Sequence, residues 1–315
     1  MTTRIAAHIA AVWKGIERLL MRFLDHHATP AEIRRQGEAQ GAIFDIWALR
    51  SGERWRHEAV IRGLCQNAFL GQHTSLCRVL GRYKMFVDTN DVGVASHLML
   101  DGYWEMWNTE VIINLVKPGM TVLDIGAHCG YFSVLMGDLV GPEGKVLSFE
   151  PNPPIAALLR RSIAVNGHHG RTTVHEMALG DTSGVASLAV PKNEPKNAHI
   201  VPGTVMRGTV QVPLQRADRI PGALEADFIK IDAEGAEQMI WRGLSGVLEQ
   251  KRPLTILLEF TTGRYANPAA FLDEILSHGF ALAEVDLAAG IVERTREDVL
   301  THDPLEDQML LLSRG

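Results

Sequence analysis

The sequence predicts an α/β protein with an open, mostly parallel sheet that has helices on both faces. From residue 121 to residue 278, apolar segments of strand length alternate with segments of helical periodicity. This alternation implies parallel strand pairing with right-handed crossovers. A loop with two glycines joins the first of these strands to its helix, as in sheets that bind nucleotides. The first 84 residues show helical periodicity alone, which predicts an α-helical N-terminal extension.

The N-terminal extension, residues 1–84, is predicted to be a helical cap or a dimerisation element. Apolar residues recur at helical spacing in residues 3–24, which predicts an amphipathic helix. Two further helices are expected over residues 31–49 and 54–80. A homodimer formed through these helices would explain their apolar faces.

The second region, residues 85–315, is predicted to form one domain. It begins with a short strand near 85–88 and a helix that ends at Leu115. The core strands are expected near 121–125, 145–149, 172–176, 227–231 and 254–259, with helices near 130–140, 153–165, 235–242 and 268–278. Two more strands are expected near 281–285 and 308–312.

Residues 181–214 break the alternation of strands and helices. They are rich in Pro, Gly, Asn and Thr and contain short alternating runs. This composition predicts a hairpin insertion with a mobile loop around residues 191–202. Loops of this kind often cover a substrate, although a surface hairpin without a chemical role explains the pattern equally well.

The glycine loop has the sequence Gly126-Ala127-His128-Cys129-Gly130 and directly follows the strand that ends at Asp124-Ile125. Glycines at both ends permit a positive φ or a close approach of the backbone to a ligand. The next strand ends at Glu150, whose carboxylate can accept hydrogen bonds from two ribose hydroxyls. Together these features predict a cofactor that contains a nucleoside, bound at the carboxyl ends of the strands.

A dinucleotide fits this loop less well than S-adenosylmethionine does. The dinucleotide fingerprint requires a second glycine where this chain has His128, whose side chain would crowd a pyrophosphate. Asp124 would also repel a pyrophosphate, whereas it suits the ammonium and sulfonium charges of S-adenosylmethionine.

Composition and charge are typical of a cytoplasmic protein. Of the 315 residues, 46% are hydrophobic and 22% are charged, and no apolar run reaches the length of a membrane span, so no stable membrane insertion is expected. The three cysteines form no paired motif, which favours buried thiols in a reducing compartment.

The N-terminal extension is basic, and the rest of the chain is acidic. Residues 1–84 carry 13 Lys and Arg against 7 Asp and Glu, while the whole chain has a net charge of −6. An anionic partner is one explanation, and a solvated helical face or a contact with the acidic part of the chain is another. No basic tract interleaved with aromatic residues accompanies the excess, so no nucleic-acid partner is expected.

A cluster of acidic residues follows the strand at 227–231. Asp232, Glu234 and Glu237 lie at the end of this strand and the start of the next helix, on the same edge of the sheet as the glycine loop. Glu237 is interpreted as a carboxylate that stabilises the helix N-terminus, and Lys230 could neutralise the cluster.

The chain resembles the FkbM family of S-adenosylmethionine-dependent methyltransferases, which have a class I Rossmann-like fold. The resemblance covers about residues 85–260. It rests on Gly102-Tyr103-Trp104-Glu105, Lys117-Pro118-Gly119, Asp124-Ile125-Gly126-Ala127, Phe149-Glu150-Pro151-Asn152, Ala178-Leu179-Gly180-Asp181 and Ile229-Lys230-Ile231-Asp232-Ala233-Glu234-Gly235-Ala236-Glu237. At His128 the family usually has Asn.

The resemblance implies a cofactor site and a reaction. Glu150 would bind the ribose, Met177 and Ala178 would flank the adenine, and Glu105 would reach the methionine end. The full set of cofactor-binding residues is expected to be Glu105, Asp124, Gly126, Ala127, Gly130, Glu150, Pro151, Met177, Ala178 and Asp232. The reaction implied is O-methylation of a small molecule such as a sugar, a polyketide or another metabolite, as in natural-product biosynthesis.

The residue that removes the proton of the acceptor is one of a few candidates. Asp232, Glu234 and His128 are expected to be catalytic, and His199 is a further candidate base. A divalent metal held by Asp232, Glu234 and Glu259 is an alternative that is not favoured.

Two other functions stay open at this point. One is N-methylation of a small molecule or peptide, and the other is a non-catalytic cofactor-binding or scaffold role. Asn152-Pro153-Pro154-Ile155 resembles the signature of enzymes that methylate base nitrogens, but it lacks the aromatic residue and follows the wrong strand. Methylation of nucleic acid is therefore not expected.

Overall fold

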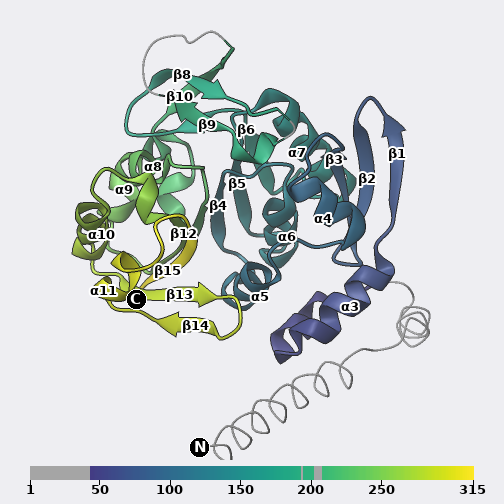
Figure 1. The fold of residues 1–315 in the computed structure, drawn as a ribbon, viewed down its shortest axis with the longest axis horizontal. Coiled ribbons are helices and arrows are strands. Elements are labelled where there is room, and N and C mark those ends of the chain that lie inside the picture. Colours follow the sequence, from purple (N-terminus) through teal and green to yellow (C-terminus); the bar gives the residue numbers. More distant parts are fainter. Residues whose placement is uncertain (1–42, 193, 202–207) are drawn as a thin grey trace, which may run out of the picture.

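The computed structural model describes residues 43–192, 194–201 and 208–315, and its main feature is an eight-stranded sheet with helices on both faces (Figure 1). The strand order is β14-β13-β15-β12-β11-β4-β5-β6, with the strands from β12 to β6 parallel and β13, β14 and β15 antiparallel to their neighbours. The strands are β4 (Thr121–Ile125), β5 (Lys145–Phe149), β6 (Thr172–His175), β11 (Phe228–Ile231), β12 (Leu254–Phe260), β13 (Ala281–Asp286), β14 (Gly290–Glu293) and β15 (Gln308–Arg314). The predicted α/β class is confirmed, and the five parallel strands lie within one residue of their predicted positions.

Alternating residues of the central strands pack against two different layers of helices. Val122 of β4 belongs to a core cluster with Ile112 and Leu135, whereas the next residue, Leu123, packs in a cluster with Ile240. The first layer holds α5 (Met106–Leu115), α6 (Tyr131–Leu139) and α7 (Pro153–Val165), and the second holds α8 (Glu237–Gly243), α9 (Ser245–Leu248) and α10 (Pro268–Ser277), while α11 (Arg296–Leu300) packs beside α10. Strands that are covered on both faces are mostly apolar, which is why β4 and β11 were recognisable in the sequence despite Asp124 and Lys230.

The strand order reverses between β4 and β11. The chain passes from β4 through α6 to β5 on one side, and β11 pairs with the other side of β4. In open α/β sheets the crevice at such a reversal, beyond the carboxyl ends of the strands, is where ligands bind. The fold therefore brings the glycine loop and the acidic cluster to one place.

The N-terminal extension is only partly helical, so the predicted helix over residues 54–80 is wrong beyond Leu64. A three-stranded antiparallel sheet replaces its second half, with a turn at Gln72 and His73 directly after Gly71; all three residues have a positive φ. The elements are η1 (Ile46–Ser51), α3 (Arg54–Leu64), β1 (Asn67–Gly71), β2 (Thr74–Val79), β3 (Tyr83–Asp88) and α4 (Val94–Leu100). Burial alternates along β2, which is the period of a strand.

The predicted boundary between residues 84 and 85 falls inside β3, which pairs with β2 and contacts α7. The extension is thus continuous with the domain over this sheet. The predicted helix over 3–24 and most of the one over 31–49 lie outside the described residues. The homodimer expected to form through these helices therefore stays a prediction.

A separate four-stranded sheet occupies the region where hairpins are predicted. β8 pairs antiparallel with both β9 and β10, and β10 also pairs with β7. The strands are β7 (Ala178–Leu179), β8 (Gly184–Ala189), β9 (His199–Val201) and β10 (Val210–Gln215), with η2 (Pro195–Asn197) between β8 and β9. The connection from β8 to β9 brings Lys196 to the ligand pocket described below.

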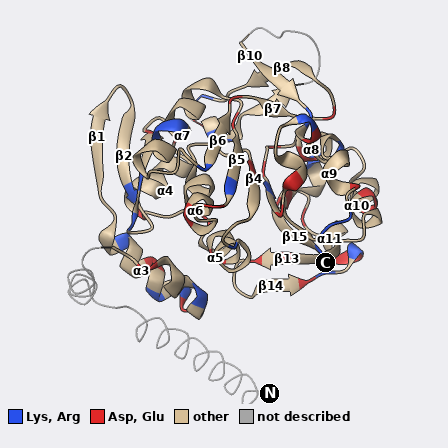
Figure 2. Cartoon of the chain, turned by 180° about the vertical axis from the view of Figure 1, so that it is seen from behind, with Lys and Arg blue, Asp and Glu red and all other residues tan. Residues whose placement is uncertain are grey.

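α3 carries several basic residues (Figure 2). Their side chains pair with carboxylates of this chain. Arg54 lies 2.7 Å from Glu110, and Arg62 lies 2.8 Å from Asp101. For these arginines the structure supports the second explanation of the basic extension, which is contact with acidic residues elsewhere in the chain.

The cysteines are free thiols. Cys77 and Cys129 are buried and Cys65 is half-buried, in line with the predicted role as small apolar residues. Within residues 43–192, 194–201 and 208–315, none of the helices combines the length and the apolar character that a membrane crossing requires.

Candidate active site

A pocket of about 1260 Å³ opens at the carboxyl ends of β4 and β11. Small-molecule sites usually measure about 300–1,000 Å³, so this pocket has room for two ligands side by side. Its walls come from the loop after β4, the ends of β5 and β11, the segment around Met177, and residues between 52 and 110. The pocket therefore lies at the strand-order reversal.

The glycine loop is fastened to the end of β5. Gly126 and Ala127 donate backbone hydrogen bonds to the carbonyl of Phe149, at 3.1 Å and 2.9 Å. Glu150 completes the attachment, because its Oε2 accepts a hydrogen bond from the backbone N–H of His128 at 2.9 Å. Its Oε1 accepts one from the N–H of Asn152 at 2.8 Å. Burial raises the pKa of Glu150 to about 7.

The two glycines are needed for packing around the loop. Both have a positive φ, of 80° at Gly126 and 97° at Gly130. A Cβ on Gly126 would lie 1.8 Å from the carbonyl oxygen of Asp232, and a Cβ on Gly130 would lie 2.4 Å from Leu159. Gly126 lines the pocket, whereas Gly130 faces α7 and does not.

Substitution of Gly126 by alanine is expected to destabilise the protein more than the same change at Gly119. Gly119 has a similar φ of 84°, but its Cβ would meet no atom within 4 Å. The φ alone costs about 1–2 kcal/mol in either variant. In Gly126→Ala the clash with the β11 tip adds about 1–3 kcal/mol. Chemical denaturation of both variants measures the difference, and equal losses would contradict this packing.

Asp124 lies behind the pocket and does not line it. The side chain is fully buried, and its Oδ2 accepts a hydrogen bond from the Ser133 hydroxyl at 2.5 Å. Burial raises the pKa of Asp124, while the nearby Lys230 ammonium lowers it. In this structure the carboxylate contacts Ser133 of α6, and its charge helps to raise the pKa of Lys230. The sequence predicts instead that it contacts the methionine part of the cofactor.

One end of the pocket is apolar. Pro151, Met177 and Ala178 line it, as the resemblance implies for the residues near the adenine. Phe149 also lines the pocket, and the ring of His175 stacks on it, with centroids 4.8 Å apart and an interplanar angle of 12°. A flat base fits such a wall.

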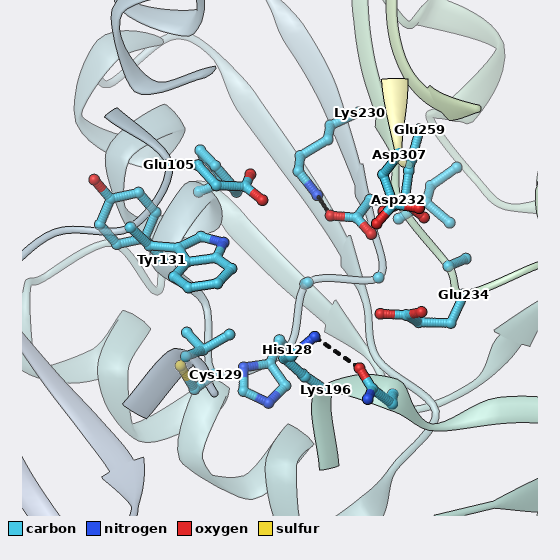
Figure 3. Close-up of a pocket in the computed structure, with 18 of the residues that line it drawn as sticks. Glu105, His128, Cys129, Tyr131, Lys196, Lys230, Asp232, Glu234, Glu259 and Asp307 are labelled. Carbon is cyan, nitrogen blue, oxygen red and sulfur yellow. Dashed lines mark hydrogen bonds and ion pairs between the residues drawn. The ribbon is translucent and has the colours of Figure 1, made fainter. Parts of the chain in front are cut away.

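Lys230 and Asp232 form an ion pair at the end of β11, with Nζ 2.8 Å from Oδ2 (Figure 3). Lys230 is 1% exposed, and its ammonium lies 4.9 Å from the centre of the Phe132 ring. Burial alone would lower the pKa of Lys230, but the carboxylates of Asp232, Asp124 and Glu105 raise it above its usual value. The ammonium therefore stays charged beside the Asp232 carboxylate.

Glu105 lines the pocket across from Asp232 (Figure 3). It precedes α5 in a left-handed conformation, with φ 39°, and its Oε2 accepts a hydrogen bond from the Asn108 side chain at 2.9 Å. Burial, and then the charge of Asp232, raise the pKa of Glu105 to about 7.

Arg264 contacts three carboxylates that line the pocket with it. Its guanidinium contacts Glu259, lies 3.1 Å from Glu234 and lies 3.3 Å from Asp307. Burial and the neighbouring Asp232 raise the pKa of Glu234 to about 7 and that of Glu259 to about 10. Glu234 can therefore exchange a proton near neutral pH, whereas Glu259 is paired with the Arg264 guanidinium.

Glu237 is structural, in agreement with its interpretation from the sequence. It is fully buried, and its Oε1 accepts hydrogen bonds from the backbone N–H groups of Ala233 and Gly235, both at 3.0 Å. The hydroxyl of Tyr265 donates to its Oε2 at 3.2 Å. This carboxylate fixes the turn that presents Glu234 to the pocket.

The two candidate histidines differ in position. His128 lines the pocket, its Nε2 is 3.6 Å from Asp91, and neither ring nitrogen forms a hydrogen bond within the described residues. Burial lowers the pKa of His128, so its imidazole is neutral at pH 7. His199 is exposed, does not line the pocket, and has its Nδ1 3.0 Å from the carbonyl of Asn197.

The three carboxylates considered as metal ligands are occupied by cations of the protein. Lys230 pairs with Asp232, and Arg264 pairs with Glu234 and Glu259. Across the described parts of the chain, no three His, Cys, Asp or Glu side chains are grouped so that they could hold a metal ion.

Sequence reasoning missed Arg264 and Lys196. Arg264 follows β12 and meets Glu234 and Asp307 only through the tertiary fold. Lys196 reaches the pocket from η2, between β8 and β9, where its ammonium lies 2.7 Å from the Asn197 side-chain oxygen. Neither residue belongs to a motif, so no local signal could have identified it.

Comparison with known proteins agrees with this geometry. Over 79 residues the chain is 37% identical to a protein-L-isoaspartate O-methyltransferase of Aeropyrum pernix, which covers 25% of this chain and 28% of that protein. It is 26% identical over 155 residues to the methyltransferase sdnD of Sordaria araneosa, covering 39% of this chain and 60% of that one. The chain thus spans less than two thirds of the length of either relative.

Among solved structures, the chain is similar to the O-methyltransferase TomG from Streptomyces achromogenes, in complex with S-adenosylmethionine. The identity is 12% and the TM-score is 0.40, over 72% of this chain and 88% of that one. The family model described as Methyltransferase FkbM domain matches residues 124–282, which is about half of the chain and includes both the glycine loop and the acidic cluster. The protein therefore belongs to the FkbM family of S-adenosylmethionine-dependent methyltransferases.

Proposed function

We propose that this methyltransferase transfers the methyl group of S-adenosylmethionine to a hydroxyl oxygen of a small molecule. The observation that carries the proposal is one continuous pocket. At one end it has Glu150 and an apolar wall that suit a nucleoside, and at the other the carboxylates of Asp232 and Glu234, which can accept a proton. Its volume accommodates a cofactor and a small acceptor together.

The residues present fit S-adenosylmethionine. The Glu150 carboxylate has accepted one backbone hydrogen bond on each oxygen, and the remaining lone pairs can accept two ribose hydroxyls. Glu105 and Asp232 provide negative charge for the ammonium and sulfonium groups. When bound, the cofactor supplies an electrophilic methyl group, so the chain has only to align the acceptor and remove its proton.

Glu234 is the base that the environment favours among the candidates. A base works best when its pKa lies near the working pH, and burial brings the pKa of Glu234 to about 7. Asp232 is less available to accept a proton, because its Oδ2 already accepts a hydrogen bond from the Lys230 ammonium at 2.8 Å. Burial makes His128 a weaker base, because it disfavours the imidazolium. We assign Asp232 to holding the cofactor and acceptor in place.

Product analysis tests the proposal directly. The full chain is incubated with S-adenosylmethionine and a panel of hydroxylated and aminated small molecules, with and without a chelator, and S-adenosylhomocysteine is measured. Transfer to hydroxyl compounds, with a new methoxy group in the product, supports the proposal. Transfer only to nitrogen would replace it with N-methylation. Cofactor binding without transfer to any compound would favour a non-catalytic role.

Cofactor binding is expected to release protons below neutral pH. The pKa values of Glu105 and Glu150 are about 7 in the free protein, so both carboxyls are largely protonated at pH 6. A cation and hydroxyl donors favour the ionised carboxylates, so binding lowers both pKa values and weakens as the pH falls. Calorimetry at pH 6.5 and 8.5, in buffers of different ionisation enthalpy, measures the release. Equal proton counts at both pH values would contradict it.

The carboxyls of Glu105 and Glu150 also affect the stability of the free protein. Their effect on stability has the opposite pH dependence to their effect on cofactor affinity, because it grows as the pH falls. Their pKa values are raised in the folded state from a usual 4.5, so the folded chain binds more protons than the unfolded chain between about pH 4.5 and pH 7. Their contribution to stability is therefore greatest below pH 4.5 and is lost as the pH rises through about 7.

A further inference from the structure

The outer half of the pocket has aromatic walls that neither the cofactor site nor the catalytic carboxylates use. We define this outer half by Trp55 of α3, Tyr103 and Trp104 in the loop before α5, Trp107 of α5, and Leu287 in the turn between β13 and β14; all five line the pocket. Large aromatic side chains of this kind provide broad apolar contact area for a ligand.

Two apolar side chains at this site are unusually exposed. Trp55 is 71% exposed and Leu287 is 62% exposed, although Tyr103, Trp104 and Trp107 beside them are half-buried against the core. Exposed apolar side chains such as these, at the edge of a ligand pocket, favour the binding of a molecule that covers them. The molecule that this position indicates is the methyl acceptor, since its hydroxyl must reach Glu234 further inside.

Arg54 fixes the outer wall. Its Nε donates a hydrogen bond to Glu110 Oε2 at 2.8 Å, and another of its nitrogens donates to the carbonyl of Leu287. One guanidinium thus joins α3, α5 and the β13–β14 turn, which carry Trp55, Trp107 and Leu287. A wall held in this way is preformed, so little ordering cost opposes ligand binding.

The charges of the pocket disfavour an anionic acceptor. Acidic side chains outnumber basic ones among the described residues of its walls. Arg54, Lys230 and Arg264 are paired with carboxylates, and Lys196 donates a hydrogen bond to the neutral side-chain amide of Asn197. The acidic ones are Glu58, Asp101, Glu105, Glu110, Glu150, Asp232, Glu234, Glu259 and Asp307, and the basic ones are Arg54, Lys196, Lys230 and Arg264. Among the described residues of the pocket, a carboxylate or phosphate on the acceptor would therefore meet more carboxyl groups than cations.

We propose that the acceptor is an uncharged ring compound with a hydroxyl group, whose ring binds in the outer half of the pocket against Trp55. This inference rests on the proposed function and adds the class of acceptor to it. The ring would cover Trp55 and Leu287, and the hydroxyl would point inward to the carboxylates. Acceptors that carry a carboxylate, sulfonate or phosphate would be rejected.

A matched pair of probes tests this assignment. Naphthalene-2,3-diol is a neutral ring diol, and 6,7-dihydroxynaphthalene-2-sulfonate is the same diol with one negative charge. Binding of each to the full chain, saturated with S-adenosylhomocysteine, is followed by ligand-observed NMR. The variants are Trp55→Ala and Trp55→Phe, with Trp47→Ala as control, because Trp47 is an exposed tryptophan of η1 that does not line the pocket.

The neutral diol is expected to bind at least about ten-fold more tightly than the sulfonate, and Trp55→Ala is expected to weaken the diol about ten-fold. Trp55→Phe should retain most of the affinity and Trp47→Ala all of it, and the affinity for S-adenosylhomocysteine should be unchanged throughout. Equal binding of the two probes, no binding of the diol, or an unchanged affinity in Trp55→Ala would overturn the assignment. Failure of S-adenosylhomocysteine to bind the wild-type chain would instead overturn the proposed function.

Discussion

Substitution of Glu234 by glutamine is expected to lower kcat about 100-fold or more, because it removes the base that accepts the proton of the hydroxyl. Glutamine keeps the size of the side chain but cannot take up a proton. In the wild type kcat should rise with pH through about 7, where Glu234 ionises, and this rise should be absent in the variant. Affinity for S-adenosylhomocysteine should change little.

Asp307→Asn is the matched control for this variant. Asp307 lies 3.3 Å from the same Arg264 guanidinium that Glu234 contacts at 3.1 Å. A loss of activity that arises from disturbing Arg264 would appear in both variants to a similar extent. Equal losses, or a retained rise of kcat near pH 7 in Glu234→Gln, would exclude Glu234 as the base and return that role to Asp232 or His128.

Substitution of Glu150 by alanine is expected to weaken binding of S-adenosylmethionine at least about 100-fold, since each lost hydrogen bond to the carboxylate contributes about 1.5–3 kcal/mol. The carboxylate also holds the backbone N–H groups of His128 and Asn152. Its removal therefore loosens the glycine loop as well as the ribose site. Calorimetric titration measures the affinity of both proteins.

Glu176→Ala provides the comparison for this second variant. Glu176 precedes Met177 and pairs with Arg160 at 2.7 Å, but it does not line the pocket. Its substitution should leave the affinity for the cofactor unchanged. An affinity within about three-fold of the wild type in Glu150→Ala would contradict the ribose-binding role, because one charge-assisted hydrogen bond is already larger.

The core of the fold could be predicted from the sequence because its signals are local. β4, the glycine loop, α6 and β5 are contiguous, and strands buried on both faces are mostly apolar. The hairpin of β1 and β2 was missed because β1 is mostly exposed and its sequence carries no clear alternation. The turn directly after Gly71 was the signal available there, and it was outweighed by the helical periodicity of the segment before it.

The candidate site could be predicted only where the residues belong to motifs. Glu105, Glu150 and Asp232 line the pocket, as expected from their place at the ends of strands and loops. The direction in which a side chain points depends on packing, so Asp124 lies behind the loop against Ser133. Arg264, Lys196 and the tryptophans of the outer half reach the pocket through contacts with residues that are distant in the sequence. A single amino-acid sequence does not reveal such contacts.

Calorimetric titration of the wild-type chain with S-adenosylhomocysteine, and separately with NAD, tests the central claim most directly. The claim is that the glycine loop and Glu150 hold the nucleoside of S-adenosylmethionine next to the carboxylates at the end of β11. The account predicts one site for S-adenosylhomocysteine and no binding of NAD. Binding of NAD alone, or of neither compound, would contradict it.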